Sequence, residues 1–154
     1  MRVGSKGRYA VIALLDVAEN SSSRPVALAE VAERQQISLS YLEQLFAMLR
    51  RAGLVVSARG PGGGYRLQRS AEEITVGEIF RAVEETGNAE KGPSEQGRDW
   101  VGGGHPTAAL WLALDERIRE FLEGITVADV MSGKVNGQFS GRPASGMNRG
   151  LSAT

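Results

Sequence analysis

The chain contains no cysteine, and this absence excludes disulfides and any metal site built from the chain's own thiolates. Long hydrophobic runs are missing too, because no apolar segment approaches the roughly 20 residues that a membrane-spanning helix needs. An Asp and a Glu interrupt the apolar positions of the N-terminal segment, so this segment does not have the pattern of a signal peptide. We therefore expect a globular, cytoplasmic protein that has no membrane partner.

Residues with the spacing of a catalytic site are also missing. The chain has one histidine, and it shows no paired carboxylates and no nucleophile next to a base, so we expect no enzyme. The net charge of the chain is zero, but its charged residues are unevenly distributed. Residues 1–70 hold ten Lys and Arg against five Asp and Glu, and the remainder holds eight against thirteen. A basic first half suggests that this half binds a polyanion.

Hydrophobic spacing predicts three helices before residue 54. The first takes Ser5 as its N-cap, a short second covers 27–36, and a longer third covers 38–53 with Gly53 as its C-cap. The short and the longer helix, joined by a few residues, have the outline of a helix-turn-helix. The apolar positions that carry these predictions are Tyr9, Ile12, Ala13 and Val17 in the first helix, Leu28, Val31 and Ala32 in the second, and Leu39, Leu42, Leu45, Phe46 and Leu49 in the third.

Two short strands are predicted next, at 54–58 and 64–69, with RGPGGG between them. A phosphate-binding loop would lead its glycines into a helix N-terminus, and a linker would not have apolar strands on both sides. We interpret the glycines as the tip of a hairpin, where they supply positive φ. The predicted fold is therefore mainly α with a small β-hairpin, a winged helix-turn-helix with an additional long helix.

The N-terminal end of the third helix is the candidate for reading DNA bases. In helix-turn-helix proteins this end enters the major groove, where Gln can read adenine and Glu can accept from cytosine. Ser38 can serve as N-cap or contact a base, and the spacing of Ser40 and Glu43 fits a capping box as well as base contact. The candidate DNA-contacting residues are Ser38, Ser40, Tyr41, Glu43, Gln44, Arg50, Arg51, Arg59, Gly60 and Pro61, with the arginines suited to phosphates or the minor groove.

Beyond the hairpin, TVGE at 75–78 predicts a capping box that opens a helix to about Glu85. A second helix from Pro106 to about Glu123 carries a wide apolar stripe, and Thr126 with Asp129 predicts a short capped helix after it. A peripheral helix has little of its own domain to cover such a stripe, so we expect a homodimer. The expected dimer contacts are Leu110, Trp111, Leu114, Ile118 and Phe121.

Composition divides the chain into four parts. We expect a DNA-binding domain over 1–86, a flexible sensor-type loop over 87–104, a dimerisation helix and short following helix over 105–131, and a disordered tail over 132–154.

Four segments together resemble the Rrf2 family of bacterial winged-helix regulators: SKGRYA, ISLSYLEQLF, LRRAGLV and RGPGGGYRL. The resemblance covers roughly residues 1–131. It implies a homodimer that binds double-stranded DNA at a partly palindromic operator, as a repressor linked to iron–sulfur cluster or iron homeostasis. By the same resemblance, Ser40, Glu43 and Gln44 would face bases and Arg59 would enter the minor groove. Ala109, Leu110 and Trp111 match the start of the family's dimerisation helix.

The chain departs from the family at the cofactor. Members that bind a [2Fe-2S] cluster carry three loop cysteines and a histidine directly before Ala-Leu-Trp, whereas here Ala108 takes the histidine position and no cysteine exists. His105 stands where the last cysteine would be, as a ligand or as a solvated loop residue, and Glu95 and Asp99 are the nearest other donors. Carboxylates and one imidazole are a poor ligand set for iron–sulfur chemistry.

Several interpretations stay open at this point. One is that the chain has lost the cluster, and another is that it holds a cluster with unusual ligands. A third is that it senses something else through residues 87–104. The glycine-rich wing can also serve as an interaction loop, which would make the chain a protein-docking module without specific DNA binding. Salt dependence separates the two functions, because phosphate contacts make binding steeply salt-dependent.

Overall fold

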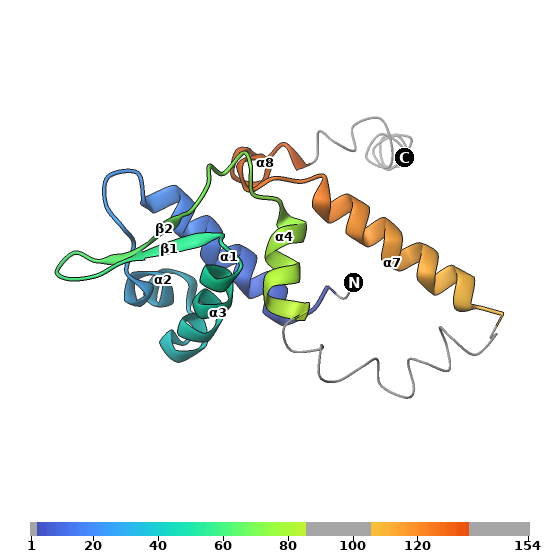
Figure 1. Cartoon of the computed structure of the whole chain (residues 1–154), viewed down its shortest axis with the longest axis horizontal. Helices are drawn as coiled ribbons and strands as arrows, with labels where there is room; N and C mark the ends of the chain where they lie inside the picture. The colour runs from blue at the N-terminus through green and yellow to red at the C-terminus, as the bar shows by residue number, and fades with distance from the viewer. Residues whose placement is uncertain (1–2, 86–105, 136–154) are drawn as a thin grey trace, which may run out of the picture.

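The computed structural model describes residues 3–85 and 106–135 (Figure 1). The loop expected at 87–104, His105 and the tail beyond 135 lie outside these residues. Within the described residues, no helix is both long and apolar enough to cross a membrane. The elements in chain order are α1 (Ser5–Asn20), α2 (Leu28–Gln35), α3 (Leu39–Arg51), β1 (Val55–Ala58), β2 (Gly64–Leu67), α4 (Val76–Phe80), η1 (Arg81–Glu85), α7 (Ala108–Glu123) and α8 (Val127–Ser132).

Helices α1 and α2 pack against α3, whose inward face is the centre of the core. Four of its side chains are fully buried, as the spacing predicts: Leu42, Leu45, Phe46 and Leu49. The prediction for Leu39 is wrong, because its side chain is 42% exposed. Leu39 is the first helical residue, and it lies at the edge of the face that the other four define.

Two details of the helix ends also differ from expectation. The N-cap of α1 is Gly4, and Ser5 is the first residue inside the helix. The C-cap of α3 is Ala52, and Gly53 follows it.

The buried face of α1 is centred on Ala10, Ala13, Leu14 and Val17, so Tyr9 and Ile12 flank it and are exposed.

β1 and β2 form the predicted antiparallel hairpin, with Val55 opposite Leu67 and Ala58 opposite Gly64. Both strands are shorter than expected: β1 begins at Val55 instead of Leu54, and β2 ends at Leu67 instead of Arg69. Gly60 and Gly62 have φ of 93° and 73°, so the glycines do supply positive φ at the tip. β2 is tied to the domain near its first residue by the backbone of Val26, whose oxygen accepts from Tyr65 N at 2.8 Å.

α4 begins at the predicted capping box. Thr75 Oγ1 accepts from Glu78 N at 3.1 Å, and Glu78 Oε2 accepts from Thr75 N at 3.0 Å. The helix continues toward residue 85 as expected, but from Arg81 its backbone follows the wider π-helical hydrogen-bond pattern. This segment, η1, contacts both α1 and α3.

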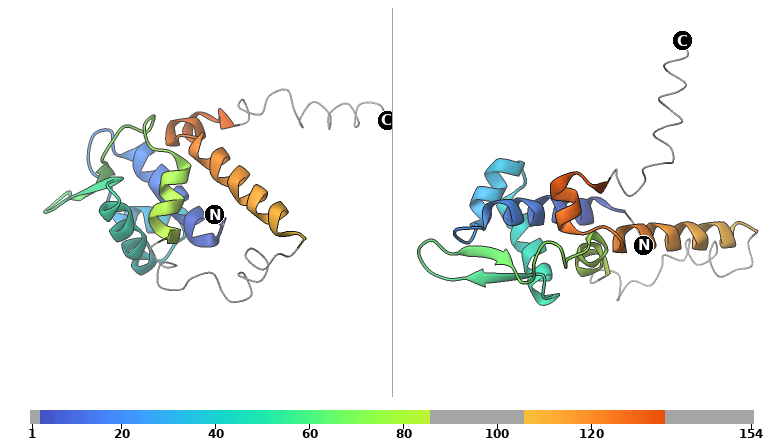
Figure 2. Two further views of the ribbon diagram at one scale, coloured as in Figure 1. Left: turned by 45° about the vertical axis from the view of Figure 1, so that its right-hand side comes forward. Right: turned by 90° about the horizontal axis from the view of Figure 1, so that it is seen from above.

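The chain returns to the same domain after α7. Val127 N donates to Ile74 O at 2.8 Å, Val76 N donates to Ile125 O at 2.8 Å, and the Val127 side chain is fully buried in the main core. The Thr126–Asp129 capping box forms as predicted, and α8 ends at Ser132. Only the C-terminal end of α7 is held this way, so the helix extends away from α4 along most of its length (Figures 1 and 2).

Candidate nucleic-acid interface

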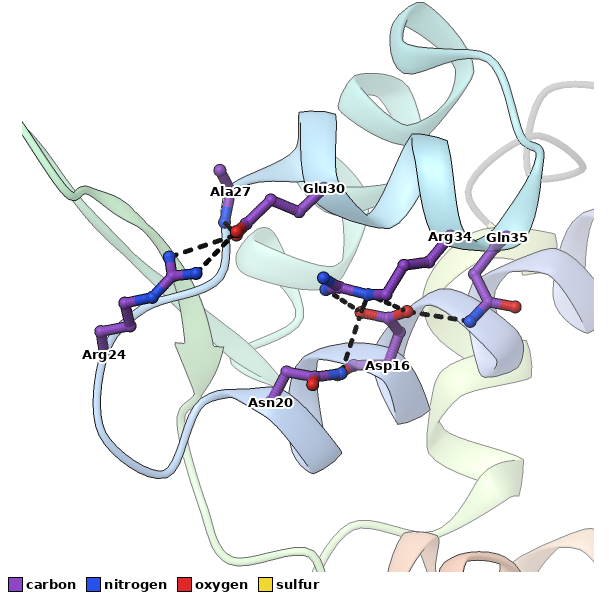
Figure 3. Close-up of polar contacts among 7 residues, drawn as sticks. All are labelled: Asp16, Asn20, Arg24, Ala27, Glu30, Arg34 and Gln35. Atoms are coloured by element: carbon purple, nitrogen blue, oxygen red, sulfur yellow. Dashed lines mark hydrogen bonds and ion pairs between the residues drawn. The ribbon is translucent and has the colours of Figure 1, made fainter.

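A buried carboxylate fixes the helix-turn-helix to α1. Asp16 on α1 is 2% exposed and accepts from Arg34 Nε at 3.0 Å, from Arg34 Nη2 at 2.6 Å and from Gln35 Nε2 at 2.8 Å (Figure 3). Asn20 donates to the same carboxylate at 3.4 Å. Burial alone would raise the pKa of Asp16, but the hydrogen bonds from Arg34 and Gln35 outweigh it, so the pKa lies below its ordinary value. The network therefore holds α2, and with it the start of α3, in one orientation.

A second polar cluster caps α2. Glu30 Oε2 accepts from the backbone N of Ala27 at 3.1 Å, and Glu30 Oε1 accepts from Arg24 Nη2 at 2.6 Å (Figure 3). These hydrogen bonds lower the pKa of the Glu30 carboxyl, and the one from Arg24 has the larger effect. The Arg24 side chain is largely in solvent and that of Glu30 is half-buried, so the ion pair adds little stability and the contact mainly sets where α2 begins.

The exposed end of α3 carries the predicted base-reading residues. Ser38 is the N-cap, and its Oγ accepts from Tyr41 N at 3.2 Å. Ser38, Ser40, Glu43 and Gln44 are exposed, and Tyr41 is half-buried. The capping box expected from Ser40 and Glu43 does not form, because the helix begins after Ser38 and so places both residues inside it. Among the described residues, no hydrogen-bond partner is found for the Glu43 carboxylate.

The predicted arginines fall on two adjacent elements. Arg50 and Arg51 occupy the last turn of α3, and Arg59 lies at the hairpin tip with Gly60 and Pro61, all exposed. None of the three arginines forms an ion pair with any residue that the structure describes. Arg8 and Arg66 are likewise exposed and form no ion pair with a described residue. The described chain pairs its six other arginines with carboxylates: Arg24 with Glu30, Arg34 with Asp16, Arg69 with Glu78, Arg81 with Glu123, Arg117 with Glu120 and Arg119 with Glu116.

The apolar stripe of α7 is divided between two environments. Ile118 is half-buried against the second apolar cluster, which consists of Val76, Phe80, Leu122 and Ile125. Leu110, Trp111, Leu114 and Phe121 are exposed, although the Trp111 indole donates to Thr107 Oγ1 at 3.1 Å. The structure thus places the candidate dimer contacts on α7 and the candidate DNA contacts on α3 and the hairpin.

The donor atoms of the chain do not fit a [2Fe-2S] cluster. The whole chain offers no thiolate and a single imidazole. Within the described ranges, no three His, Cys, Asp or Glu side chains are grouped so as to hold a metal ion. Glu95, Asp99 and His105 lie outside the described residues. Even a cluster with histidine ligands keeps two thiolates on its other iron, and this chain has none to offer.

An exposed helix end beside a basic hairpin defines a winged helix-turn-helix of the DNA-binding class. The family model for Rrf2, described as an iron-dependent transcriptional regulator, matches residues 3–133, and the chain belongs to the Rrf2 family. It is 51% identical over 144 residues to the HTH-type transcriptional regulator IscR of Klebsiella pneumoniae (strain 342), covering 92% of this chain and 86% of the relative. The IscR of Pectobacterium carotovorum subsp. carotovorum (strain PC1) is 53% identical over 136 residues, covering 87% and 81%.

Solved structures agree with the family assignment. The structure of T. potens IscR matches with a TM-score of 0.69 at 37% identity, covering 90% of this chain and 91% of that one. CymR, described as the global cysteine regulator of B. subtilis, matches with a TM-score of 0.70 at 33% identity, covering 86% and 97%. The predicted fold class is therefore confirmed, and the chain is a DNA-binding, IscR-like transcriptional regulator rather than an enzyme.

Sequence reasoning missed part of the site. The Asp16 network and the contacts of η1 with α1 were not predicted. The sequence does contain a signal for the Asp16 network. Asp16 interrupts the apolar run VIALLDVA, and an acid in such a buried run needs a partner.

Proposed function

We propose that the chain binds its operator through α3 and the hairpin. The observation that carries this proposal is the group of exposed arginines, Arg50, Arg51 and Arg59, for which the described residues supply no ion-pair partner. Guanidinium groups without carboxylate partners are free to contact phosphates, and an arginine on a loop tip suits a narrow minor groove. Ser38, Ser40, Tyr41, Glu43 and Gln44 would then lie in the major groove.

The working form is a homodimer that acts as a repressor. Leu110, Leu114 and Phe121 form an exposed apolar strip along α7, and a second copy of the same helix would cover it in an isologous contact. Two copies of the winged helix would read a partly palindromic operator, since protein symmetry and site symmetry match. A bound dimer would block a promoter without further machinery.

The regulator works without a [2Fe-2S] cluster, because the chain lacks the thiolates that such a cluster requires. Its link to iron or iron–sulfur homeostasis rests on the family, whose description is iron-dependent. Residues 87–104 remain the candidate sensor segment. A regulator that binds promoter DNA acts where the bacterial chromosome is, so we assign the chain to the cytoplasm.

Selection from a random duplex library followed by mobility shifts at graded salt tests the proposed function. We expect recovery of a partly palindromic sequence, bound as a dimer, with an affinity that falls steeply as salt rises. A scrambled duplex of the same length is the control. Failure to enrich any sequence, together with salt-independent association, would instead support the alternative of a protein-docking module.

A further inference from the structure

Helix α1 begins without a cap from its own sequence. Its N-cap is Gly4, which has no side chain, and its first turn holds no acidic residue. Lys6 and Arg8 instead bring positive charge to the end of the helix where the macrodipole is already positive. An acceptor and a negative charge from elsewhere in the fold would stabilise such a start.

Glu84 supplies both from the far end of the domain. Its Oε1 accepts from Gly7 N at 3.0 Å, across 77 positions of sequence, and the same oxygen lies 3.0 Å from where a Cβ on Gly4 would stand. Glu84 lies on η1, the π-helical segment. π-Helical turns are rare and occur frequently at functional sites.

The contact between η1, α4 and α1 is close. The ring of Phe80, the last residue of α4, occupies the space that a side chain on Gly7 would need. Phe80 is buried, so the ring cannot move aside into solvent. Glycine at position 7 thus lets the two helices approach near enough for Glu84 to reach the α1 backbone.

The same contact reaches the end of α3 that is proposed to enter DNA. Tyr9, two residues after Gly7, packs edge-to-face on Tyr41 with ring centroids 5.9 Å apart. Tyr41 lies in the first turn of α3, where its N donates to the N-cap Ser38. Burial raises the pKa of the Tyr41 phenol, and the negative charges of Glu84 and then Tyr9 raise it further.

We propose that Glu84 is a positioning residue for the recognition helix: it caps α1 from η1 and thereby holds Tyr9 against Tyr41 at the start of α3. This inference rests on the proposed function, since it assumes that this end of α3 enters the DNA groove. Glu84 itself does not contact DNA. Its effect on binding is transmitted through α1 and the two rings.

Operator affinity tests the proposal, with the duplex recovered by selection as the probe. Glu84→Ala is expected to weaken binding by about tenfold. Glu84→Gln should recover most of the loss, because its amide oxygen can still accept from Gly7 N. Glu19→Ala, which removes an exposed acid from the other end of α1, is the matched control and should leave affinity unchanged. Circular dichroism confirms that each variant is folded.

A double-mutant cycle identifies the route of the effect. If Glu84 acts through the ring pair, adding Glu84→Ala to Tyr9→Ala should weaken binding no further than Tyr9→Ala does alone. A merely structural role would give additive losses, which would overturn the proposal. Unchanged affinity of Glu84→Ala, measured beside a wild-type chain that binds, would overturn it as well.

A measurement without DNA separates this proposal from the proposed function. In a Tyr9→Phe, Tyr65→Phe background Tyr41 is the only tyrosine, and its ionisation is followed by absorbance on raising the pH. Both Glu84→Ala and Glu84→Gln should lower the pKa of Tyr41, because both remove the nearby negative charge. A pKa that does not move would refute the contact, whereas a wild-type chain that binds no duplex would refute the proposed function itself.

Discussion

At the scale of single residues, Arg59 combines two features: it lies at the exposed hairpin tip, and no described carboxylate forms an ion pair with it. Replacing Arg59 by alanine should therefore weaken operator binding by about 1–3 kcal/mol and leave the fold intact, since the side chain is on an exposed tip. Arg119→Ala on α7 removes the same charge far along the chain and is the control. Fluorescence anisotropy at physiological salt measures both, and equal affinity of Arg59→Ala and wild type would show that the hairpin tip does not contact DNA.

Glu43 is predicted to act on discrimination more than on total affinity. A carboxylate in the major groove accepts from cytosine and repels bases that offer only acceptors, so its removal lifts a penalty on wrong sites. Glu43→Ala should therefore broaden the set of duplexes recovered in a selection. Because Ser38 and not Glu43 caps α3, loss of helix stability is not the expected cause of any change. A uniform loss across all duplexes would contradict a role in base reading.

Asp16 should leave a signature in the pH dependence of stability. Its pKa is lowered in the folded state, so its contribution is complete above the ordinary value of about 3.9 and is lost as pH falls below it. Asp16→Asn should reduce the free energy of unfolding at pH 7 by about 1.5–3 kcal/mol. Urea unfolding over a pH series measures this. The difference between wild type and variant should shrink below about pH 3.9, and a constant difference would contradict the assigned pKa shift.

At the scale of elements, the sequence predicted those features that depend on neighbouring positions. The buried face of α3, the capping boxes at Thr75 and Thr126 and the glycine hairpin all follow from local spacing or local backbone needs, and the structure confirms them. What could not be predicted depends on distant partners. Nothing near Glu84 in the sequence indicates that it caps a helix 77 positions away.

The errors have the same physical origin. Leu39 has the hydrophobic character and roughly the spacing of a core residue, yet the position of the N-cap Ser38 leaves it at the edge of the buried face. The spacing of Ser40 and Glu43 left a capping box open as an alternative, because two serines in SLS offer competing N-caps. The structure takes Ser38 as the N-cap, as expected, and excludes that alternative. The contacts of the candidate site with DNA remain predictions.

The exposed strip of α7 leads to a prediction about assembly. Leu114→Asp would bury an unpaired charge between two copies of the helix, so it should yield monomers and lose most operator affinity. Leu112→Asp is a matched control, because Leu112 is similarly exposed, at 51% against 47% for Leu114, but lies on the opposite side of the helix. Analytical ultracentrifugation distinguishes the outcomes, and an intact Leu114→Asp dimer would place the interface elsewhere.

At the scale of the whole molecule, membership of an iron-dependent family and a chain without thiolates lead to different expectations. Iron–sulfur clusters with histidine ligands still keep two cysteines on the other iron, and this chain offers one histidine and no cysteine. Carboxylates or an external thiol would have to fill the remaining positions, and neither forms a closed, soft cage around iron. The regulator should therefore bind its operator as purified, without a stable cluster.

Anaerobic purification followed by iron and sulfide analysis tests this expectation. We expect substoichiometric iron and sulfide, no visible charge-transfer bands, and operator binding that His105→Ala does not change. The wild type treated with a chelator is the control, and it should retain full affinity. Stoichiometric iron and sulfide with visible bands that His105→Ala abolishes would make His105 a ligand. The family's cofactor would then persist in this chain on ligands that the sequence gives little reason to expect.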